Sequence, residues 1–480
     1  MNAMLCPIAS HARTTPLMPF IKFGDEIYTY EYCNAKTARI TAGLESQAIA
    51  PGERIGIHAT MSPDVICCIL ALFRHKAVPV LLSTRSTGLQ INALLKQVAC
   101  DACLLCDNIA LTSDACRTIR ISQLEHEPAD AHPSQLQSPE INTEGSECIL
   151  FTSGSTRRPR AVVHTFSTFM QSALGSNAFF AANSTDCWQL ALPMYHAAGL
   201  AILFRMVLAG GSVGIVSLNE EPDRMQRMNI TRTSLVLTQL KRILDSPEWL
   251  ACFQSLRTIL VGGGPLPDAL VQRALDHELN IVPGYGSTEM ASTITALPHE
   301  EVRHRIHQSG TALPGRDVSI AANGEVLVKG TTLCKGYYQN GSVSPCRDAN
   351  GWFHTGDAGS LDKDGFLTLF GRKDLMFISG GENIYPEEIE RALLSLPEID
   401  MAIVVPVNDT EFGARPFAFV RIANSLLLSK EQIATALEPH LEHFKIPCQF
   451  SLFPAPASDT ITKPDRRQLH KTAQQLHAGG

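Results

Sequence analysis

Short apolar runs alternate with helical patterns along the first third of the chain. The runs with strand character occur at 53–59, 77–82, 102–106 and 148–153. Between them lie segments with helical spacing of apolar residues, at 64–74 and 89–99. This alternation predicts sheets covered by helices, which is the α/β class. Residues 124–146 are rich in Pro, Glu, Ser and His, a composition typical of an exposed linker.

The same alternation continues in the middle of the chain. Further strands are predicted at 234–240, 258–264 and 279–289. Two glycine-rich stretches follow apolar strand residues, and ligands of α/β sheets collect at the carboxyl ends of strands. The candidate binding residues from these stretches are Gly262, Gly263, Gly284 and Gly286.

The pattern changes at about residue 316. Asn323-Gly324 separates two alternating runs and predicts a β-hairpin. Pro386 then opens a helix, and strands at 399–407, 415–422 and 448–453 and a helix at 429–441 follow. We therefore predict two domains. The first, 1–372, is a large N-terminal domain of helix-covered sheets plus a β-rich subdomain, and the second, 373–480, is a small, mobile α+β domain.

Composition narrows the class of protein. The net charge of the 480-residue chain is −7, and no dense basic run occurs outside 157–160, so nucleic-acid binding has little support. The longest apolar run, 65–73, is too short to span a bilayer, and the first residues lack the pattern of a signal peptide. The fourteen cysteines are scattered, which favours a reduced, cytoplasmic setting. Cys100, Cys103 and Cys106 have part of an iron–sulfur spacing, but small buried side chains explain them better.

The stretch 150–166, LFTSGSTRRPRAVVHTF, combines hydroxyls, glycine and cations. Five consecutive residues supply the hydroxyls and the flexible turn: Thr152, Ser153, Gly154, Ser155 and Thr156. Arg157, Arg158 and Arg160 follow. Backbone N–H groups, hydroxyls and guanidinium groups together suit a multiply charged phosphate. The ordinary nucleotide loop G-x-x-x-x-G-K-[ST] is absent, and a polar surface loop between a strand and a helix is the alternative.

Five motifs in one order carry a family resemblance. They are TSGSTRRPR (152–160), GYGSTE (284–289), GWFHTGDAG (351–359), GRKDLMFISGGENIYPEEIE (371–390) and ITKPDRRQL (461–469). In this order and spacing the chain resembles the acyl-adenylate-forming superfamily, which includes acyl-CoA synthetases, peptide-synthetase adenylation domains and firefly luciferase. Taken singly, each matching residue has an ordinary structural explanation. Five matches in register favour the family.

The resemblance implies a reaction in which a carboxylate attacks the α-phosphorus of ATP and pyrophosphate leaves. Such a site must neutralise charge and hold the two groups in line. The resemblance assigns the β- and γ-phosphates to 152–160 and the remaining contacts to single residues: Tyr285 to adenine, Thr288 to the α-phosphate, Glu289 to Mg²⁺, Asp357 and Arg372 to the ribose, and Lys463 to the α-phosphate and the reacting carboxylate. Asp374 matches the hinge position between the two domains.

Three positions depart from the family pattern. Arg157 stands where glycine is expected, Arg160 replaces a lysine, and Thr462 replaces a glycine before Lys463. Arginine keeps the positive charge at 160, although its planar fork differs from a compact ammonium. Arg157 replaces a residue that tolerates positive φ, so we expect the phosphate segment to differ in shape or mobility from the family pattern.

The resemblance also implies a second step, in which the thiol of CoA attacks the adenylate. Gly380 and Gly381 match the glycines that leave a path for the pantetheine arm, and no carrier-protein domain follows, so free CoA is the expected acceptor. Several finer stretches, among them LPMYHAAGLAILFRMVLAGG and EFGARPFAFV, are similar to the 2-succinylbenzoate–CoA ligases of menaquinone synthesis. His196 would line the acyl pocket, with Gly284 beside the acid, and Arg205 would hold the carboxylate that does not react.

Two other functions stay open at this point. One is a CoA ligase for another aryl acid or a fatty acid, and the other is a non-catalytic acyl-nucleotide binding protein. A fatty-acid enzyme needs an apolar tunnel, which a buried Arg205 would oppose. A protein that only binds should lack Lys463 or Glu289, and both are present. The sequence leaves open whether the chain forms a homo-oligomer.

Overall fold

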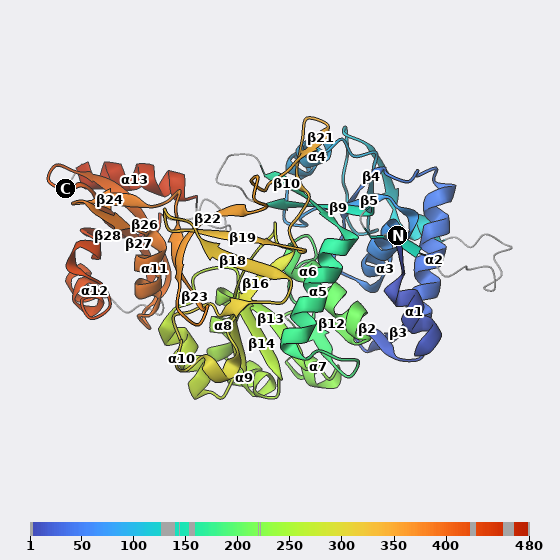
Figure 1. Cartoon of the computed structure of the whole chain (residues 1–480), viewed down its shortest axis with the longest axis horizontal. Coiled ribbons are helices and arrows are strands. Elements are labelled where there is room, and N and C mark those ends of the chain that lie inside the picture. Colours follow the sequence, from blue (N-terminus) through green and yellow to red (C-terminus); the bar gives the residue numbers. More distant parts are fainter. Residues whose placement is uncertain are drawn as a thin grey trace.

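The fold is described from a computed structural model. The structure describes residues 3–125, 140–143, 145–152, 159–218, 220, 222–422, 429–454 and 465–478. Figure 1 shows the C-terminal elements gathered at one end of an elongated molecule. The α/β class is confirmed, with several sheets covered by helices. No helix among these residues has the length and apolar character needed to cross a bilayer.

An eight-stranded sheet forms the part of the molecule that contains the predicted phosphate segment. Its strand order is β21-β20-β10-β9-β5-β4-β6-β7. The strands are β4 (Arg54–His58), β5 (Val78–Leu81), β6 (Ala102–Leu105), β7 (Arg117–Arg120), β9 (Glu147–Thr152), β10 (Arg160–Thr165), β20 (Gly336–Gln339) and β21 (Ser342–Ser344). β9, β5, β4, β6 and β7 run parallel to one another, whereas β10, β20 and β21 add to the β9 edge in antiparallel pairs.

A nine-stranded sheet carries the GYGSTE motif. Its order is β17-β16-β15-β14-β13-β11-β12-β2-β3. The strands are β2 (Pro19–Phe23), β3 (Glu26–Thr29), β11 (Cys187–Gln189), β12 (Ser212–Ile215), β13 (Arg232–Val236), β14 (Thr258–Gly262), β15 (Ile281–Ser287), β16 (Ser292–Ala296) and β17 (Thr311–Ala312). A four-stranded sheet, β18-β19-β22-β23, is the predicted β-rich region; it contains β18 (Arg316–Ile320), β19 (Glu325–Gly330), β22 (Phe353–Leu361) and β23 (Leu367–Arg372). The hairpin predicted at Asn323-Gly324 joins β18 to β19, and Gly324 has φ +77°.

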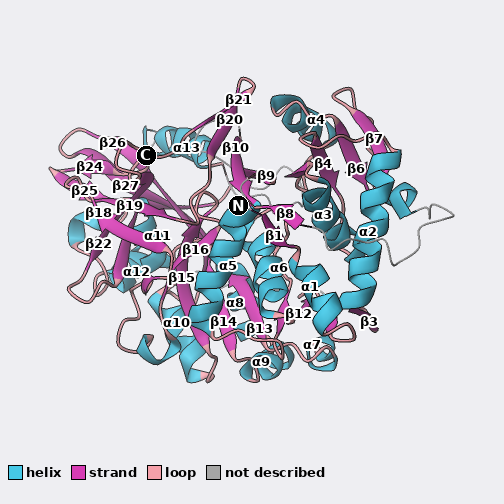
Figure 2. Ribbon diagram, turned by 45° about the vertical axis from the view of Figure 1, so that its right-hand side comes forward, coloured by secondary structure: helices cyan, strands magenta, loops and turns pink. Residues whose placement is uncertain are grey.

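Helices cover both large sheets. Those of the N-terminal part are α1 (Pro7–Thr14), α2 (Tyr30–Ser46), α3 (Pro63–His75), α4 (Gly88–Gln97), α5 (Phe166–Phe180), α6 (Ala197–Ala209), α7 (Asp223–Arg227), α8 (Leu237–Leu244), α9 (Pro247–Gln254) and α10 (Asp268–Asp276). α3 begins where sequence predicts it, because the Ser62 side chain accepts a hydrogen bond from the Val65 N–H and Pro63 occupies the first turn. Figure 2 shows α5 and α6 side by side over the strands of the nine-stranded sheet.

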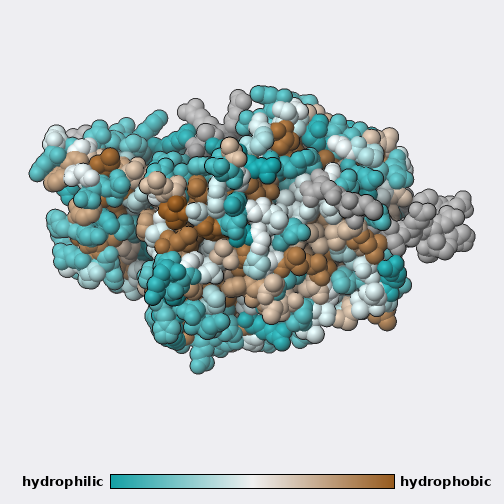
Figure 3. Space-filling model, in the orientation of Figure 1, coloured by the Kyte–Doolittle hydropathy of each residue, from teal (hydrophilic) through white to brown (hydrophobic). Residues whose placement is uncertain are grey.

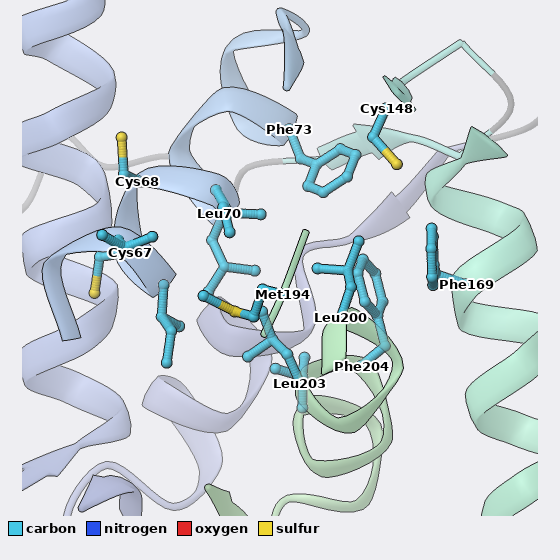
Figure 4. Packing of buried hydrophobic residues seen from close by; sticks show 14 of the residues in the cluster. Cys67, Cys68, Leu70, Phe73, Cys148, Phe169, Met194, Leu200, Leu203 and Phe204 are labelled. Carbon is cyan, nitrogen blue, oxygen red and sulfur yellow. The ribbon is translucent and has the colours of Figure 1, made fainter. Parts of the chain in front are cut away.

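The main core lies where α3, α5 and α6 meet. Phe73, Phe169 and Phe204 come from these three helices and are at most 2% exposed. The Phe169 and Phe204 ring centroids lie 5.1 Å apart, and Phe73 meets Phe204 edge-on at 6.0 Å (Figure 4). Burial of each such ring stabilises the fold by roughly 1.5–3 kcal/mol. This packing fixes α6, the helix that carries Arg205.

The C-terminal part is an α+β unit. It contains β24 (Phe377–Ser379), β25 (Glu382–Ile384), α11 (Pro386–Leu394), β26 (Ile399–Asp409), β27 (Gly413–Ile422), α12 (Lys430–Leu437), β28 (Gln449–Leu452) and α13 (Arg466–Ala478). The domain boundary at 372/373 stays a prediction; it falls where β23 ends.

The face of the whole molecule that is drawn in Figure 3 shows hydrophobic residues in separate patches among hydrophilic ones.

Several predicted elements differ from the observed ones. The strand predicted at 234–240 ends at Val236, and α8 begins at Leu237, where Gln239 Oε1 accepts from the Val236 N–H at 3.0 Å. The helix predicted at 429–441 is α12, which ends at Leu437. The predicted linker 124–146 includes β8 (Glu140–Asn142), which pairs with β1 (Ala3–Leu5); residues 126–139 lie outside the described part. A short paired strand therefore interrupts a composition that predicts a loop.

Candidate active site

The predicted phosphate segment joins two antiparallel strands. Thr152, at the end of β9, lies opposite Arg160, at the start of β10. The next element after β9 is thus a strand, whereas the alternative of a polar surface loop placed a helix there. Ser153, Gly154, Ser155 and Thr156 lie outside the described residues.

A tyrosine that no motif includes links this segment to the GYGSTE motif. Tyr337 lies on β20, the strand next to β10. The guanidinium of Arg160 lies 5.4 Å from the centroid of the Tyr337 ring. The Tyr337 hydroxyl donates to Oε1 of Glu289 at 2.8 Å. The predicted metal carboxylate and the predicted phosphate cation thus contact the same aromatic side chain.

The first four residues of the GYGSTE motif lie on a strand, within the range predicted at 279–289, and its last two residues follow that strand. β15 continues to Ser287 because it pairs antiparallel with β16, so Gly284, Tyr285 and Gly286 are strand residues. Glycine is required at 286, since a Cβ there would lie 2.2 Å from the Ser292 carbonyl oxygen.

The glycines at the ends of β14 and β15 allow the two strands to approach closely. A Cβ on Gly262 would lie 3.0 Å from the carbonyl oxygen of Gly284, and one on Gly284 would lie 3.1 Å from Leu260 Cδ1. Gly263 follows with φ +85°, a conformation that favours glycine. Close packing of the two strands therefore explains why glycine occurs at these positions. Contact between these glycines and a ligand stays a prediction.

Thr288 and Glu289 follow β15 and are held from β10. His164 Nε2 donates to the carbonyl oxygen of Thr288 at 2.7 Å, and His164 Nδ1 lies 3.1 Å from the Thr168 hydroxyl. Burial lowers the pKa of His164 to about 4, so its imidazole is neutral at pH 7. A neutral buried histidine therefore ties the turn after β15 to the strand after the phosphate segment.

Three residues assigned to the nucleoside lie in one hydrogen-bonded group. The Tyr285 hydroxyl donates to Asp357 Oδ2 at 2.6 Å, and Arg372 Nη1 donates to Asp357 Oδ1 at 3.3 Å. Burial raises the pKa of Asp357, although the Tyr285 hydroxyl and the Arg372 charge oppose that shift. Burial and the Asp357 charge raise the pKa of Tyr285 well above its ordinary value. A protonated phenol, a carboxyl group and a guanidinium are thus within reach of a common ligand.

The glycines around Asp357 in GWFHTGDAG predict a turn, but Asp357 lies on a strand. It lies on β22 directly opposite Arg372 on β23. The glycine before it has φ +74°, and a Cβ on Gly356 would lie 2.9 Å from the Arg372 guanidinium. The antiparallel register, rather than a turn, brings the two charged groups together.

The predicted hinge contacts the same arginine. Arg372 Nε donates to Asp374 Oδ1 at 3.1 Å, and Asp374 lies in the turn between β23 and β24. Burial lowers the pKa of Arg372, but the hydrogen bond to Asp374 and the charge of Asp357 outweigh burial. The pKa of Arg372 therefore lies above its ordinary value.

The predicted CoA glycines form the turn between β24 and β25. Gly380 and Gly381 have φ +57° and +91°, and no heavy atom lies within 4 Å of a Cβ built on Gly381. Both residues are exposed, which leaves the backbone of this turn open to a ligand. Lys463 lies outside the described residues.

Arg205 is buried inside the large N-terminal part. It lies on α6, is 1% exposed, and donates from Nη2 to the Thr293 hydroxyl at 3.0 Å. Its guanidinium lies 5.0 Å from the Trp188 ring centroid and 5.7 Å from that of Phe180. Among the described residues no carboxylate pairs with it, and its Nε has no hydrogen-bond partner. The guanidinium is therefore a buried cation whose contacts are a hydroxyl and two aromatic rings.

The charge of Arg205 is maintained at neutral pH. Burial, with a smaller effect from the Arg316 cation, lowers the pKa of Arg205 to about 9. Arg316 itself donates to the Ser172 carbonyl and hydroxyl oxygens and to the Pro314 carbonyl oxygen. Within the described part of the chain, Arg316 thus makes three hydrogen bonds to neighbouring oxygens, whereas Arg205 makes one side-chain hydrogen bond, to Thr293.

His196 lies at the start of α6. Its exposed side chain packs against the Tyr195 ring, with ring centroids 4.7 Å apart. Partial burial of the imidazole, with the cation of Arg85, lowers the pKa of His196. His196 is therefore a surface residue, and its place beside the acid stays a prediction.

The cysteines offer no metal site within the described residues. Cys103 on β6 and Cys100 just before it are buried, as predicted for small core side chains, and Cys106 is partly exposed. Burial raises the pKa of Cys103 to about 12, which keeps it a thiol. No cluster of three potential metal ligands occurs in the part of the chain that the structure covers.

Comparison with known proteins gives one consistent family. The model of the family described as AMP-binding enzyme matches residues 8–338. A 2-succinylbenzoate–CoA ligase of Bacillus velezensis is 30% identical over 483 residues, covering 97% of this chain and 98% of that protein. A ligase of the same name from Bacillus cereus is 30% identical and covers 96% and 98%.

Solved structures give the same result. An o-succinylbenzoate CoA synthetase of Bacillus subtilis in complex with the acyl-adenylate OSB-AMP is similar with a TM-score of 0.87 at 26% identity, covering 98% of both chains. The same enzyme in complex with ATP and magnesium ion has a TM-score of 0.84 at 26% identity, covering 94% of this chain and 96% of that one.

Proposed function

The chain belongs to the AMP-binding enzymes, and from this premise we propose that it is an acid–thiol ligase that adenylates 2-succinylbenzoate and transfers the acyl group to CoA. The products are 2-succinylbenzoyl-CoA, AMP and pyrophosphate, and the reaction belongs to menaquinone synthesis. The family resemblance inferred from the five motifs is confirmed. ATP, Mg²⁺ and CoA are the cofactors and co-substrates.

The observation that carries the acid specificity is the buried guanidinium of Arg205. 2-Succinylbenzoate is an aromatic dicarboxylate, so one carboxylate reacts and the other must be held. Arg205 is charged, lies among the Trp188 and Phe180 rings, and lacks a carboxylate partner among the described residues. A cation set among aromatic rings suits a ligand whose ring carries a second carboxylate.

The nucleotide end of the site supports the first half-reaction. Glu289 presents carboxylate oxygens, the ligands that Mg²⁺ prefers, and Tyr337 already holds one of them. Bound there, Mg²⁺ would neutralise triphosphate charge while Arg160 approaches the same phosphates. Tyr285 would stack on adenine, Asp357 would accept from the ribose hydroxyls, and Arg372 would donate to the same sugar.

The first half-reaction needs in-line geometry and charge compensation. Thr288 would contact the α-phosphate, and its position depends on the His164 hydrogen bond to its carbonyl oxygen. Lys463, in the predicted mobile domain, would bind the oxygens of the α-phosphate and the reacting carboxylate. Asp374 would act as the hinge that exchanges Lys463 for the Gly380-Gly381 turn in the thioester step.

Other acids and a binding-only role fit less well. A fatty-acid ligase would place a hydrocarbon chain against the unpaired Arg205 cation, which desolvates a charge without a partner. A protein that only binds acyl-nucleotides would not need both Lys463 and Glu289. Aryl acids with a single carboxylate would leave Arg205 unused.

A cytoplasmic setting is part of the proposal. All fourteen cysteines are free thiols, and most are buried, which suits a reducing compartment. The partners of the chain are small molecules, namely the acid, ATP and CoA.

The test is pyrophosphate release across a panel of acids. The purified protein would be incubated with ATP, Mg²⁺ and either 2-succinylbenzoate, benzoate or octanoate. The highest kcat/KM is expected for 2-succinylbenzoate. Faster turnover of octanoate than of 2-succinylbenzoate would exclude the proposed substrate.

A further inference from the structure

We propose that Tyr337 is a positioning residue for adenylation, orienting the Glu289 carboxylate so that its second oxygen is directed to the magnesium ion of the nucleotide. This inference rests on the proposed function, in which Glu289 is the metal carboxylate. Neither the five motifs nor the comparisons assign Tyr337 a role. Its position follows only from strand register.

Two bonds from one segment hold Glu289. The Tyr337 hydroxyl donates to Oε1 at 2.8 Å, and the Cys334 N–H donates to the Glu289 carbonyl oxygen at 2.7 Å. The side chain and the main chain of Glu289 are therefore both anchored to residues 334–337. Among the described residues only Oε1 of this carboxylate accepts a hydrogen bond, so Oε2 is available to a cation.

The segment that carries Tyr337 is itself fixed. Tyr337 pairs with Val162 of β10, and the Lys335 N–H donates to the Val163 carbonyl oxygen at 2.9 Å. Gly336 has φ +147°, and a Cβ there would lie 2.0 Å from the Ser344 carbonyl oxygen. Because no other residue fits this contact, β20 is held between β10 and β21 in one register.

The phenol is a neutral donor that contacts one carboxylate oxygen of Glu289. A neutral donor satisfies Oε1 without cancelling the negative charge that a cation needs. The Arg160 guanidinium, 5.4 Å from the ring centroid, packs against the same side chain. Tyr337 thereby fixes the distance between the metal carboxylate and the phosphate-binding strand.

Tyr337→Phe removes the hydroxyl and keeps the ring under Arg160. Residues that orient a metal ligand typically contribute 10- to 100-fold to metal affinity or activity. The Mg²⁺ concentration for half-maximal pyrophosphate release is therefore expected to rise about tenfold. The second half-reaction starts from acyl-adenylate and CoA and contains no triphosphate, so its rate should stay within about twofold.

Tyr338→Phe is the matched control. Tyr338 is the next residue of the same strand and points to the other face, where its ring packs with the buried cluster beside β9 and β10 and lies 5.5 Å from the Arg54 guanidinium. Tyr338→Phe removes the same hydroxyl group one residue later, and the Mg²⁺ dependence of pyrophosphate release should stay as in the wild type. Melting temperatures of both variants report any general loss of structure.

Calorimetric titration of Mg²⁺–ATP, without any acid, tests Tyr337 separately from the substrate. Weaker Mg²⁺–ATP binding by Tyr337→Phe alone, with normal conversion of supplied adenylate, supports the inference. Unchanged Mg²⁺ dependence and binding, or an equal fall of both half-reactions, overturns it. If the wild type binds Mg²⁺–ATP but releases no pyrophosphate with 2-succinylbenzoate, the proposed substrate is wrong. The role of Tyr337 is then decided by the calorimetric titration alone.

Discussion

Replacing Arg205 by leucine should lower the use of 2-succinylbenzoate without unfolding the protein. The guanidinium is buried, bonded to the Thr293 hydroxyl, and has no carboxylate partner among the described residues. Burial of a charge without an ionic partner costs free energy, and Arg205→Leu removes that cost. The melting temperature of Arg205→Leu should therefore be close to that of the wild type or above it.

The expected loss follows from one charge-assisted hydrogen bond. Such a bond contributes roughly 1.5–3 kcal/mol. At about 1.4 kcal/mol per factor of ten, kcat/KM for 2-succinylbenzoate should fall by about one to two powers of ten. The KM for ATP should not change, because the predicted nucleotide contacts come from other elements. Arg205→Lys keeps the charge and loses the planar fork, so an intermediate loss is expected.

The assay is pyrophosphate release by both variants and the wild type, with 2-succinylbenzoate, benzoate and octanoate compared. In Arg205→Leu the preference for the dicarboxylate over octanoate should shrink, since only the dicarboxylate loses a partner. A folded Arg205→Leu variant with the wild-type preference would refute the role of Arg205. That result would leave the substrate itself untouched.

Three further perturbations test other parts of the account. The pKa of His164 in the folded protein, about 4, lies below its ordinary value of 6.5. The contribution of neutral His164 to the free energy of unfolding is therefore complete above pH 6.5 and is lost as the pH falls towards 4. The stability difference between wild type and His164→Asn should shrink by about 2 kcal/mol from pH 7 to pH 5 in urea unfolding, and a constant difference would contradict this. Lys463→Ala should lose adenylation yet convert supplied acyl-adenylate and CoA to thioester; an equal loss in both assays would contradict the division of roles. Asp374→Pro, which fixes φ in the turn after β23, should impair one half-reaction much more than the other, with Asp374→Asn as the control that keeps the backbone free, and near-normal rates of both steps would remove the hinge from 374.

The five sequence motifs indicate which residues lie together at the nucleotide. They do not indicate which backbone pairings bring these residues together. Tyr285 and Asp357 are 72 positions apart in sequence and share a 2.6 Å hydrogen bond. The five motifs placed both at the nucleotide, but the turn expected around Asp357 is a strand paired with β23. Glycine-rich sequence indicates turns as readily as it indicates closely packed strands.

Contacts that depend on strand register were not predictable. Tyr337 reaches Glu289 because β20 pairs with β10, and no local pattern specifies that pairing. His164 and Thr293 likewise act through neighbours more than 80 positions away. Short apolar runs are equally ambiguous, as at Leu237, where a predicted strand is a helix start. The residues at the family positions were identifiable from sequence, whereas those that hold them required the fold.

The most direct test of the central claim is the product balance of a single incubation. The protein, 2-succinylbenzoate, ATP, Mg²⁺ and CoA would be mixed, and the products measured by liquid chromatography and mass spectrometry. An acid–thiol ligase should form AMP, pyrophosphate and 2-succinylbenzoyl-CoA in equal amounts. Formation of ADP, or of AMP without any 2-succinylbenzoyl-CoA, would contradict the account.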